Sequence, residues 1–287
     1  MAKLLLAKEV NAALCERTRE RAAALRGRGI TPTLAIVRVG EREDDLYYER
    51  GAVKRCSDNG IEVRRLTFDA DVTTERMIDA VRSLNDDDGV HGVLILRPLP
   101  SGIDEKAVCE ALDPCKDVDG ITSVSASALY QGSGAGFAPC TACSVMEILR
   151  HYGIDLRGRK AVVIGRSLVI GKPVAMMLLA ENATVTICHS KSRDLQEICR
   201  GADILIASAG RARMVTAEYL SAGQTVIDVG INVGEDGKMC GDVDGAAAEG
   251  LVGAYTPVPG GVGGVTTSIL AAHVAEAAER MAGFGRV

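Results

Sequence analysis

Short apolar runs alternate with longer segments of helical periodicity, and this alternation restricts the fold more than any other feature of the sequence. In the first half, apolar runs at 33–39, 61–68 and 89–96 are separated by helical patterns at 43–58 and 73–85. Strands that alternate with helices of this length build βα units around a parallel sheet. The sequence therefore predicts an α/β fold.

The second half repeats this plan after a change of composition. Residues 113–140 combine turn formers with a glycine-rich stretch, which is typical of a domain boundary. A chain of 287 residues fits about two domains. We therefore predict a first domain over 1–139 and a second, Rossmann-like domain with a doubly wound parallel sheet over 140–264. Helices are expected between the four strands of the second domain, which are predicted at 160–165, 183–188, 202–210 and 224–230.

Composition excludes several classes of protein. The formal net charge is -5 and only 3% of the residues are aromatic, so a nucleic-acid partner is not expected. No apolar run approaches the roughly 18 residues of a membrane span, and the apolar start is too short for a signal peptide. Nine scattered cysteines indicate a reduced, cytoplasmic protein. The pair Cys140 and Cys143 has no second pair at zinc spacing, so no metal site is expected.

One turn has the chemistry of a dinucleotide site. The strand predicted at 160–165 ends at Gly165, and Gly171 and Pro173 follow at the start of a helix. Glycines let the backbone approach a pyrophosphate closely, and the free N–H groups of a helix N-terminus bind it. An ordinary βα turn is the alternative for this segment alone, but the consecutive βα units favour a nucleotide.

Charge indicates which nicotinamide cofactor binds. NAD sites usually carry an acidic residue at the end of the second strand, where it binds the ribose 2′-hydroxyl. Here that strand ends in Cys188-His189-Ser190-Lys191 without a carboxylate, and Arg166 lies in the first turn. These residues suit a 2′-phosphate, so NADP is expected and NAD is less favoured.

Together these residues resemble the methylenetetrahydrofolate dehydrogenase/cyclohydrolase family of the bacterial FolD type. The order and spacing of the matching stretches cover nearly the whole chain, and the last of them is highly specific. They are KDVDGI (116–121), PCTA (139–142), VVIGRSLVIGKP (162–173), CHSKS (188–192), VIDVGIN (226–232), GDVD (241–244) and YTPVPGGVGG (255–264).

The resemblance implies a fold, a reaction and a set of residues. The family has two α/β domains with a folate cleft between them, a C-terminal helix (here 265–287) that packs back on the first domain, and a homodimeric assembly. Its reaction moves a hydride from methylenetetrahydrofolate to NADP, and the methenyl product is then hydrolysed to formyltetrahydrofolate. Carried over by motif, the cofactor-binding residues are Gly165, Arg166, Ser167, Ser190 and Ile231.

The resemblance also assigns the folate side. Tyr48 and Asp119 are the implied catalytic and folate-binding residues. A tyrosine ring can stack on the flat pterin, and a carboxylate can accept paired hydrogen bonds from an aminopyrimidine edge. Without the family, Tyr48 would be a half-buried core ring and Asp119 equally a turn cap. The other substrate-binding residues are Leu96 and Arg97 at a strand end and a loop of Pro259, Gly260, Gly261, Val262 and Gly263.

The chain departs from the family pattern around Tyr48. A lysine normally follows this tyrosine by four residues, but an alignment without gaps places Ala52 there. Leu96 replaces a glutamine, and Gly264 replaces a proline after the glycine-rich loop. The usual Asn-Pro-Ala-Ser before the tyrosine is replaced by Arg42-Glu43-Asp44-Asp45.

The nearby cations are poor substitutes for the lost lysine. Lys54 faces away from Tyr48 by helical geometry, and Arg55 lies about one turn too far and stays protonated. Arg97 would either repel a methenyl cation or hold the carboxylate tail of folate, and the sequence leaves both open.

Three functions are therefore compatible with the sequence. The first is a methylenetetrahydrofolate dehydrogenase with weak or absent cyclohydrolase activity, because the lysine placed to manage the proton of the attacking water is missing. The second is the fully bifunctional enzyme with another group in that role. The third is a catalytically idle binding protein, which the intact folate and NADP motifs disfavour. A shikimate-dehydrogenase-like enzyme is a remote fourth, because it has no place for the PVPGGVG loop.

Overall fold

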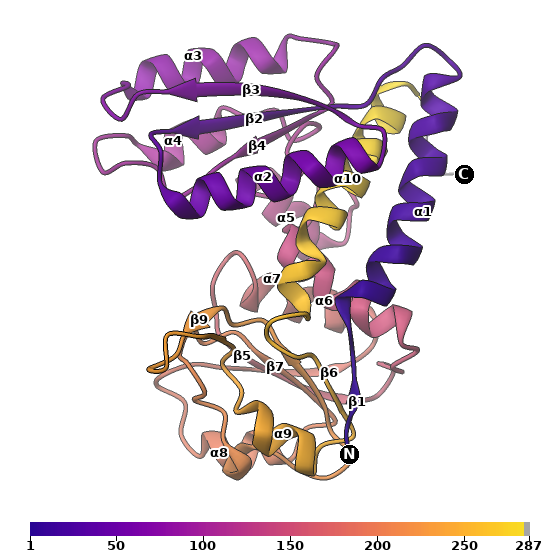
Figure 1. Ribbon diagram of the computed structural model, residues 1–287, viewed down its shortest axis with the longest axis vertical. Coiled ribbons are helices and arrows are strands. Elements are labelled where there is room, and N and C mark those ends of the chain that lie inside the picture. Colours follow the sequence, from indigo (N-terminus) through magenta and orange to yellow (C-terminus); the bar gives the residue numbers. More distant parts are fainter. Residues whose placement is uncertain (284–287) are drawn as a thin grey trace. The chain divides into compact units, whose positions relative to one another are not determined.

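The computed structural model describes residues 1–283 and divides into two compact units (Figure 1). The six-stranded unit contains Met1–Asn11 and Thr141–Thr266, and the three-stranded unit contains Ala12–Cys140 and the chain from Thr267 onward. Residues 284–287, the end of the helix predicted at 265–287, lie outside the described part. Each unit is an α/β structure with a parallel sheet, as the sequence predicts.

The six-stranded unit is built on a fully parallel sheet with the order β1-β11-β8-β7-β5-β6. The central strands β5, β7 and β8 are almost entirely buried, which is typical of a parallel sheet covered on both faces. The strand bounds are β1 Lys3–Leu4, β5 Lys160–Ile164, β6 Thr184–Cys188, β7 Ile204–Ala207, β8 Thr225–Asp228 and β11 Ala254–Tyr255.

The connections of this unit differ from the prediction at one point. Helices α7 (Gly171–Ala180) and α8 (Leu195–Arg200) follow β5 and β6 as expected. Between β7 and β8, however, the chain forms only the short 3-10 helix η1 (Ala217–Tyr219), so the helix expected there is wrong. Gly210 and Gly223 lie in this connecting segment, and glycine disfavours a helix. The remaining elements are α6 Cys140–His151, the antiparallel pair β9 Asn232–Val233 and β10 Met239–Cys240, α9 Gly245–Leu251 and η2 Val262–Gly264.

The three-stranded unit contains a parallel sheet with the order β3-β2-β4. Alternate residues of β2 (Thr33–Val39) face opposite sides, and Ala35, Val37 and Val39 join a core with α3 (Thr74–Asn85) and α4 (Glu105–Glu110). In Figure 1, α2 (Glu43–Asp58) lies on the side of the sheet opposite α3. The other two strands are β3 Glu62–Phe68 and β4 Gly92–Ile95.

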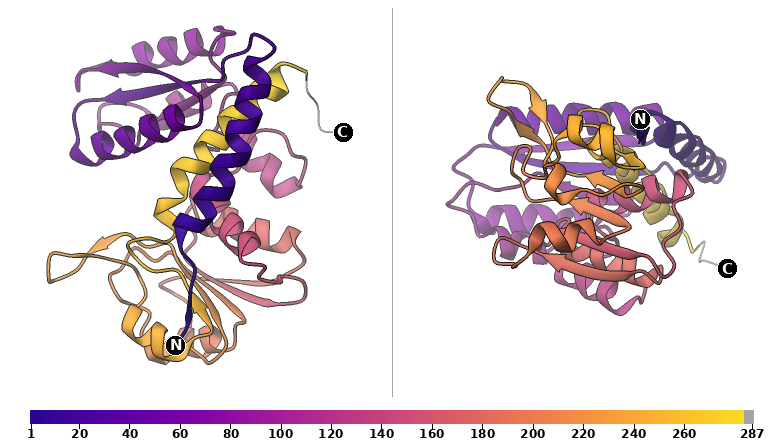
Figure 2. Two further views of the ribbon diagram at one scale, coloured as in Figure 1. Left: turned by 45° about the vertical axis from the view of Figure 1, so that its right-hand side comes forward. Right: turned by 90° about the horizontal axis from the view of Figure 1, so that it is seen from below.

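Helices from the two ends of the chain lie side by side in this unit (Figure 2). Arg21 of α1 (Ala7–Arg26) forms a two-pronged ion pair with Glu279 of α10 (Thr266–Met281), with its shortest N–O distance at 2.5 Å. The thiol of Cys15 lies 3.8 Å from the hydroxyl of Ser268. The C-terminal helix therefore packs against α1.

Helix α5 (Ser123–Gln131) is not predicted from the sequence and lies inside the stretch that is interpreted as a domain boundary. Thr122 caps this helix by accepting a hydrogen bond from the backbone N–H of Ser125. Its weak apolar pattern is mostly Ser and Ala, which explains why periodicity did not identify it. In residues 1–283, no helix is both long and apolar enough to cross a membrane.

Candidate active site

Strands β5 and β6 are neighbours, and they bring the predicted cofactor residues Arg166 and Ser190 to one edge of the six-stranded sheet. Ile164 of β5 pairs with Cys188 of β6, and the N–H of Gly165 donates to the carbonyl of Cys188 at 2.9 Å. Arg166 and Ser190 each lie two residues beyond these paired positions, and both are exposed. The structure therefore places a cation and a hydroxyl beside each other where two neighbouring strands end.

The turn itself has room for no side chain at its closest approach. Gly165 has φ +130, and a Cβ there would lie 2.4 Å from the hydroxyl of Ser208. A Cβ on Gly171 would lie 2.2 Å from the carbonyl oxygen of Gly165. Only glycines allow this packing, so the turn has the tight backbone that a bound pyrophosphate requires.

Helix α7 begins at this turn with its N-terminus unblocked by acidic side chains. No acidic residue lies in its first turn, and the hydroxyl of Ser167 accepts a hydrogen bond from the N–H of Ile170 at 3.1 Å. A ten-residue helix carries a partial positive charge at this end, although the N–H of Lys172 donates to the carbonyl of Ser167 and Pro173 has no N–H. The geometry and charge therefore fit the phosphates of a dinucleotide.

Ile231 and the glycine-rich loop meet in the same unit. A Cβ on Gly263 would lie 3.0 Å from Cδ1 of Ile231, so the predicted cofactor residue touches the predicted folate loop. The carbonyl of Gly260 accepts a hydrogen bond from the N–H of Ala7 at 2.8 Å, which ties the loop to the start of α1. The loop of residues 259–263 is thus held by contacts at both ends.

In the three-stranded unit, Tyr48 and Asp119 lie close enough to influence each other. Burial raises the pKa of Tyr48 well above its ordinary value, and the charges of Asp119 and Cys140 raise it further. Burial also raises the pKa of Asp119, whereas hydrogen bonds from the thiol and backbone N–H of Cys140 and the nearby charge of Arg97 lower it. The structure therefore brings together Tyr48, Arg97 and Asp119, as predicted from the motifs, and adds Cys140.

The loop that carries Asp119 is anchored by Lys116 and Asp117, which lie three and two residues before it. The ammonium of Lys116 is buried and donates to three backbone carbonyls at 2.7 to 2.8 Å. The carboxylate of Asp117 is fully buried and accepts four hydrogen bonds, from the N–H groups of Ile121 and Thr122 and the hydroxyls of Thr122 and Ser125. These bonds fix the loop, and with it the position of Asp119.

Two positions that depart from the family pattern, 52 and 96, are apolar and buried. Ala52 has no exposed surface and Leu96 is 6% exposed. Lys54 pairs instead with Asp58 at 2.8 Å on the surface, and Arg55 contacts the thiol of Cys15 at 3.4 Å. Neither cation therefore takes the place of the lysine that the family carries at position 52.

Sequence reasoning missed two sets of residues. The first is Cys140, which is considered from the sequence only as a possible metal ligand. It is buried, and its N–H and thiol form hydrogen bonds with Asp119. The second is a pair of acids: Asp242 accepts from backbone N–H groups after β7, and Asp228 accepts from backbone N–H groups after β10. Their only signal was their place in the VIDVGIN and GDVD motifs, where a carboxylate beside glycine looks like turn chemistry.

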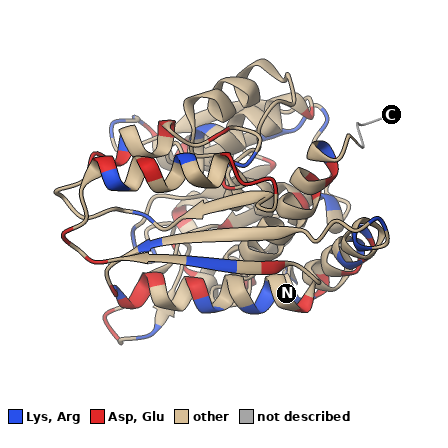
Figure 3. Ribbon diagram, turned by 90° about the horizontal axis from the view of Figure 1, so that it is seen from above, with Lys and Arg blue, Asp and Glu red and all other residues tan. Residues whose placement is uncertain are grey.

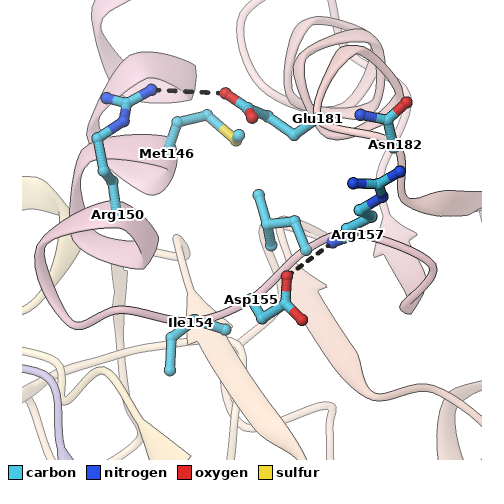
Figure 4. A pocket seen from close by; sticks show the side chains of 8 residues that line it. Met146, Arg150, Ile154, Asp155, Arg157, Glu181 and Asn182 are labelled. Carbon is cyan, nitrogen blue, oxygen red and sulfur yellow. Dashed lines mark hydrogen bonds and ion pairs between the residues drawn. The ribbon is translucent and has the colours of Figure 1, made fainter.

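A separate cavity of about 320 Å³ lies at the amino edge of the six-stranded sheet (Figure 4). Its charged groups are partly paired with each other: Arg150 lies 3.7 Å from Glu181, and Asp155 accepts from the N–H of Arg157 at 3.1 Å. It lies away from the residues that the motifs predict. Among residues 1–283, no group of three or more His, Cys, Asp or Glu side chains could hold a metal ion.

Comparison with known protein families supports the same two halves. Residues 5–119 match the model of the tetrahydrofolate dehydrogenase/cyclohydrolase catalytic domain, and residues 139–282 match the model of the NAD(P)-binding domain of that family. The chain is 52% identical over 249 residues to the protein named "Bifunctional protein FolD" of Clostridioides difficile, covering 87% of each chain.

Solved structures with the same fold include enzymes from distant organisms. The FolD methylenetetrahydrofolate dehydrogenase/cyclohydrolase of Campylobacter jejuni superposes with a TM-score of 0.95 at 36% identity, covering 98% of this chain and 99% of that chain. The FolD enzyme of Trypanosoma brucei, solved with NADP and an inhibitor, has a TM-score of 0.90 at 33% identity and covers 97% and 98% of the two chains.

Proposed function

Because the chain belongs to the tetrahydrofolate dehydrogenase/cyclohydrolase family, we propose that it oxidises 5,10-methylenetetrahydrofolate to methenyltetrahydrofolate with NADP and hydrolyses the product weakly or not at all. The family is an oxidoreductase family of one-carbon metabolism, so the chain is an enzyme of tetrahydrofolate chemistry. The observation that carries the finer proposal is the buried Ala52, one turn after Tyr48, where no ionisable side chain is available. Because position 52 has no group that could activate water, we expect a dehydrogenase with little cyclohydrolase activity.

The dehydrogenase reaction needs orientation more than a protein acid or base. When bound, NADP supplies the acceptor for the hydride of the methylene carbon, and the enzyme must hold the two near contact. We assign Gly165, Arg166, Ser167, Ser190 and Ile231 to the cofactor. We assign Tyr48, Leu96, Arg97, Asp119 and residues 259–263 to the folate.

The choice of NADP over NAD rests on the charge at the end of β6. Arg166 and Ser190 are exposed at neighbouring strand ends, and the segment after β6 has no carboxylate before Asp194. This arrangement suits a 2′-phosphate. The NADP that the Trypanosoma brucei structure contains gives the same choice independent support.

The fully bifunctional enzyme is a second candidate, favoured by the names of the relatives. The chain shares 52% identity with a protein called bifunctional, and the comparisons fit both candidates. In the bifunctional enzyme, a group other than the missing lysine activates the water that attacks the methenyl carbon. The residue at position 52 is the observation that separates the two.

A single assay tests the proposal. The enzyme is mixed with methylenetetrahydrofolate and either NADP or NAD, and the reduced cofactor and the methenyl product are followed separately. We expect reduction of NADP with accumulation of methenyltetrahydrofolate. No reduction of either cofactor at saturating folate would refute the dehydrogenase, and rapid enzyme-dependent loss of the methenyl product would favour the bifunctional candidate.

The remaining parts of the proposal concern assembly and location. We expect a cytoplasmic homodimer with a folate cleft between the domains 1–139 and 140–264, and no nucleic-acid partner. The support is the family resemblance for the dimer and the cleft, and charge and cysteine usage for the rest. Sedimentation of the purified protein measures the assembly directly.

A further inference from the structure

Asp45 is a buried carboxylate to which no residue of the described part, 1–283, donates a hydrogen bond. It lies in the first turn of α2 and is 6% exposed. Its nearest cation in residues 1–283 is Arg42, whose Nε lies 3.8 Å from Oδ2, too far for a hydrogen bond. A terminal nitrogen of Arg42 donates instead to the carbonyl of Pro98 at 2.8 Å. Burial raises the pKa of Asp45, and the neighbouring Asp44 adds to the effect, while Arg42 and Arg38 oppose it.

The next carboxylate on the same helix face, Glu49, is an acid with a structural role, because two arginines pair with it. Glu49 is also buried, but it lies 2.7 Å from Nε of Arg38 and 3.0 Å from Nε of Arg65. Arg38 also donates to the carbonyl of Gly40. The cations of this region therefore make their short contacts with Glu49 and the backbone, and Asp45 keeps only the 3.8 Å ion pair with Arg42. The charged residues of α2 and of the neighbouring strands are coloured in Figure 3.

Asp45 lies on the face of α2 that carries the candidate active site. It precedes Tyr48 by three residues, a spacing that makes helix side chains neighbours. Position 52 lies seven residues on, within about 20° of Asp45 around the helix axis. In the family pattern this stripe has a serine at position 45 and a lysine at position 52; here it has Asp45 and Ala52. The charge of the stripe thus changes from positive to negative.

Burying a carboxylate that accepts no hydrogen bond costs free energy, so one held only by the 3.8 Å ion pair with Arg42 is a candidate for function. Oxidation of the substrate removes a hydride, with its electron pair, from the methylene carbon, and leaves a cation shared between the two nitrogens that flank it. We propose that Asp45 stabilises this methenyl cation electrostatically, as the substitute for an active-site lysine that would repel it. The proposal rests on the proposed function. It explains why the lysine and the serine changed together: the site favours formation of the cation over its hydrolysis.

Direct binding tests this inference without requiring turnover. The affinities of methenyltetrahydrofolate, which carries the cation, and of tetrahydrofolate, which has no bridge carbon, are measured by equilibrium dialysis. The variants are Asp45→Asn, the family-like Asp45→Ser, and Asp44→Asn as a matched control. Asp44 is exposed in the same helical turn, so the control removes an equal charge from solvent.

We expect both Asp45 variants to bind methenyltetrahydrofolate about 10- to 100-fold more weakly, with tetrahydrofolate binding and the control unchanged. The maximal dehydrogenase rate should fall by a similar factor, while the melting temperature stays equal or rises, since a purely structural acid would lower it on removal. Equal affinity of Asp45→Asn and the native protein for the cation, or equal losses for both folates, overturns the inference. A native enzyme that binds the cation but reduces neither cofactor overturns the proposed function instead.

Discussion

The carboxylate of Asp228 accepts a hydrogen bond from the backbone N–H of Asp242 at 2.9 Å, so two buried acidic residues are linked behind the edge where the cofactor residues lie. Asp242 in turn accepts hydrogen bonds from the N–H groups that follow β7 and from the amide of Asn232, at 2.5 to 3.0 Å; the backbone donors are Ala209, Gly210 and Arg211. Asp228 also accepts from Gly230 and Val243. The two carboxylates accept hydrogen bonds from backbone N–H groups of these loops. Without them, these donors would be buried without an acceptor.

Replacing Asp242 by Ala should destabilise the protein strongly. The change leaves three backbone N–H groups and one amide without their acceptor in a site with no exposed surface. We expect a loss of about 2 to 4 kcal/mol in the free energy of unfolding, measured by urea denaturation. Asp236→Asn, on the exposed loop between β9 and β10, is the control and should change stability little. Similar stability of Asp242→Ala and the native chain would contradict the network.

Asp228 should make the free energy of unfolding fall as the pH rises, which is opposite to the effect of a carboxyl group whose pKa is lowered by folding. Burial raises its pKa to about 6, although hydrogen bonds from Val243, Asp242 and Gly230 oppose the shift. Between the ordinary value of about 4 and this value, the folded state holds a proton that the unfolded state has released. The contribution is therefore present below about pH 4 and is lost as the pH rises through about 6.

A comparison with Asp228→Asn isolates this contribution. The stability of the native chain relative to the variant should fall by at most about 3 kcal/mol between pH 4 and pH 7. Urea denaturation at several pH values measures it. Asp236→Asn serves again as the control, because hydrogen bonding lowers the pKa of Asp236 and moves its titration below this window. A difference that grows with pH would show that the Asp228 carboxylate is stabilised by its donors.

Replacing Arg166 by Ala should weaken NADP much more than NAD. Arg166 is the cation placed two residues after β5, beside Ser190, and a 2′-phosphate would lose its charge partner. We expect the KM for NADP to rise about 10- to 100-fold and the KM for NAD to change by less than about threefold. Arg159→Ala removes an equal charge from the amino end of β5 and should affect neither. Equal losses for the two cofactors would refute the assignment.

The sequence predicted the parallel strands well and the short elements poorly. Runs such as 160–164 are buried on both faces, so hydrophobicity alone identifies them. The two-residue strands β1 and β11 depend on pairing between Lys3 and Ala254, which are far apart in the chain and carry no local pattern. Tertiary pairing of this kind cannot be inferred from propensity.

The candidate site also contains residues whose role could be predicted from the sequence and residues whose role could not. The glycines of the turn were predictable because their chemistry is local: a strand, a tight turn and a helix follow each other directly. The weak pairing of Asp45 was not predictable, since it depends on where the nitrogens of two arginines lie. Arg38 pairs with Glu49, and Arg42 donates to the carbonyl of Pro98 and only approaches Asp45 at 3.8 Å. A run of charges in a sequence looks like a solvated helix start until the structure shows which carboxylate is buried.

Cyclohydrolase activity should be weak in the native chain and should increase when the family residues are restored. Water must lose a proton as it attacks the methenyl carbon, and a desolvated lysine can be tuned to act near neutral pH. Ala52 cannot do this, and Lys54 and Arg55 are engaged elsewhere. We therefore expect Ala52→Lys with Leu96→Gln to raise the enzyme-dependent hydrolysis of added methenyltetrahydrofolate about 10-fold or more.

Two comparisons make this measurement decisive. Ser57→Lys adds the same charge at an exposed position of α2 and should leave hydrolysis at the native level. Combining Asp45→Ser with the double change restores the positive stripe of the family and should raise hydrolysis further, because a carboxylate no longer stabilises the cation against attack. Fast hydrolysis by the native enzyme at near-neutral pH would show that a residue other than position 52 activates the water. Loss of that activity in Asp45→Asn would then identify Asp45 as the base, and would replace its role as a stabiliser of the cation.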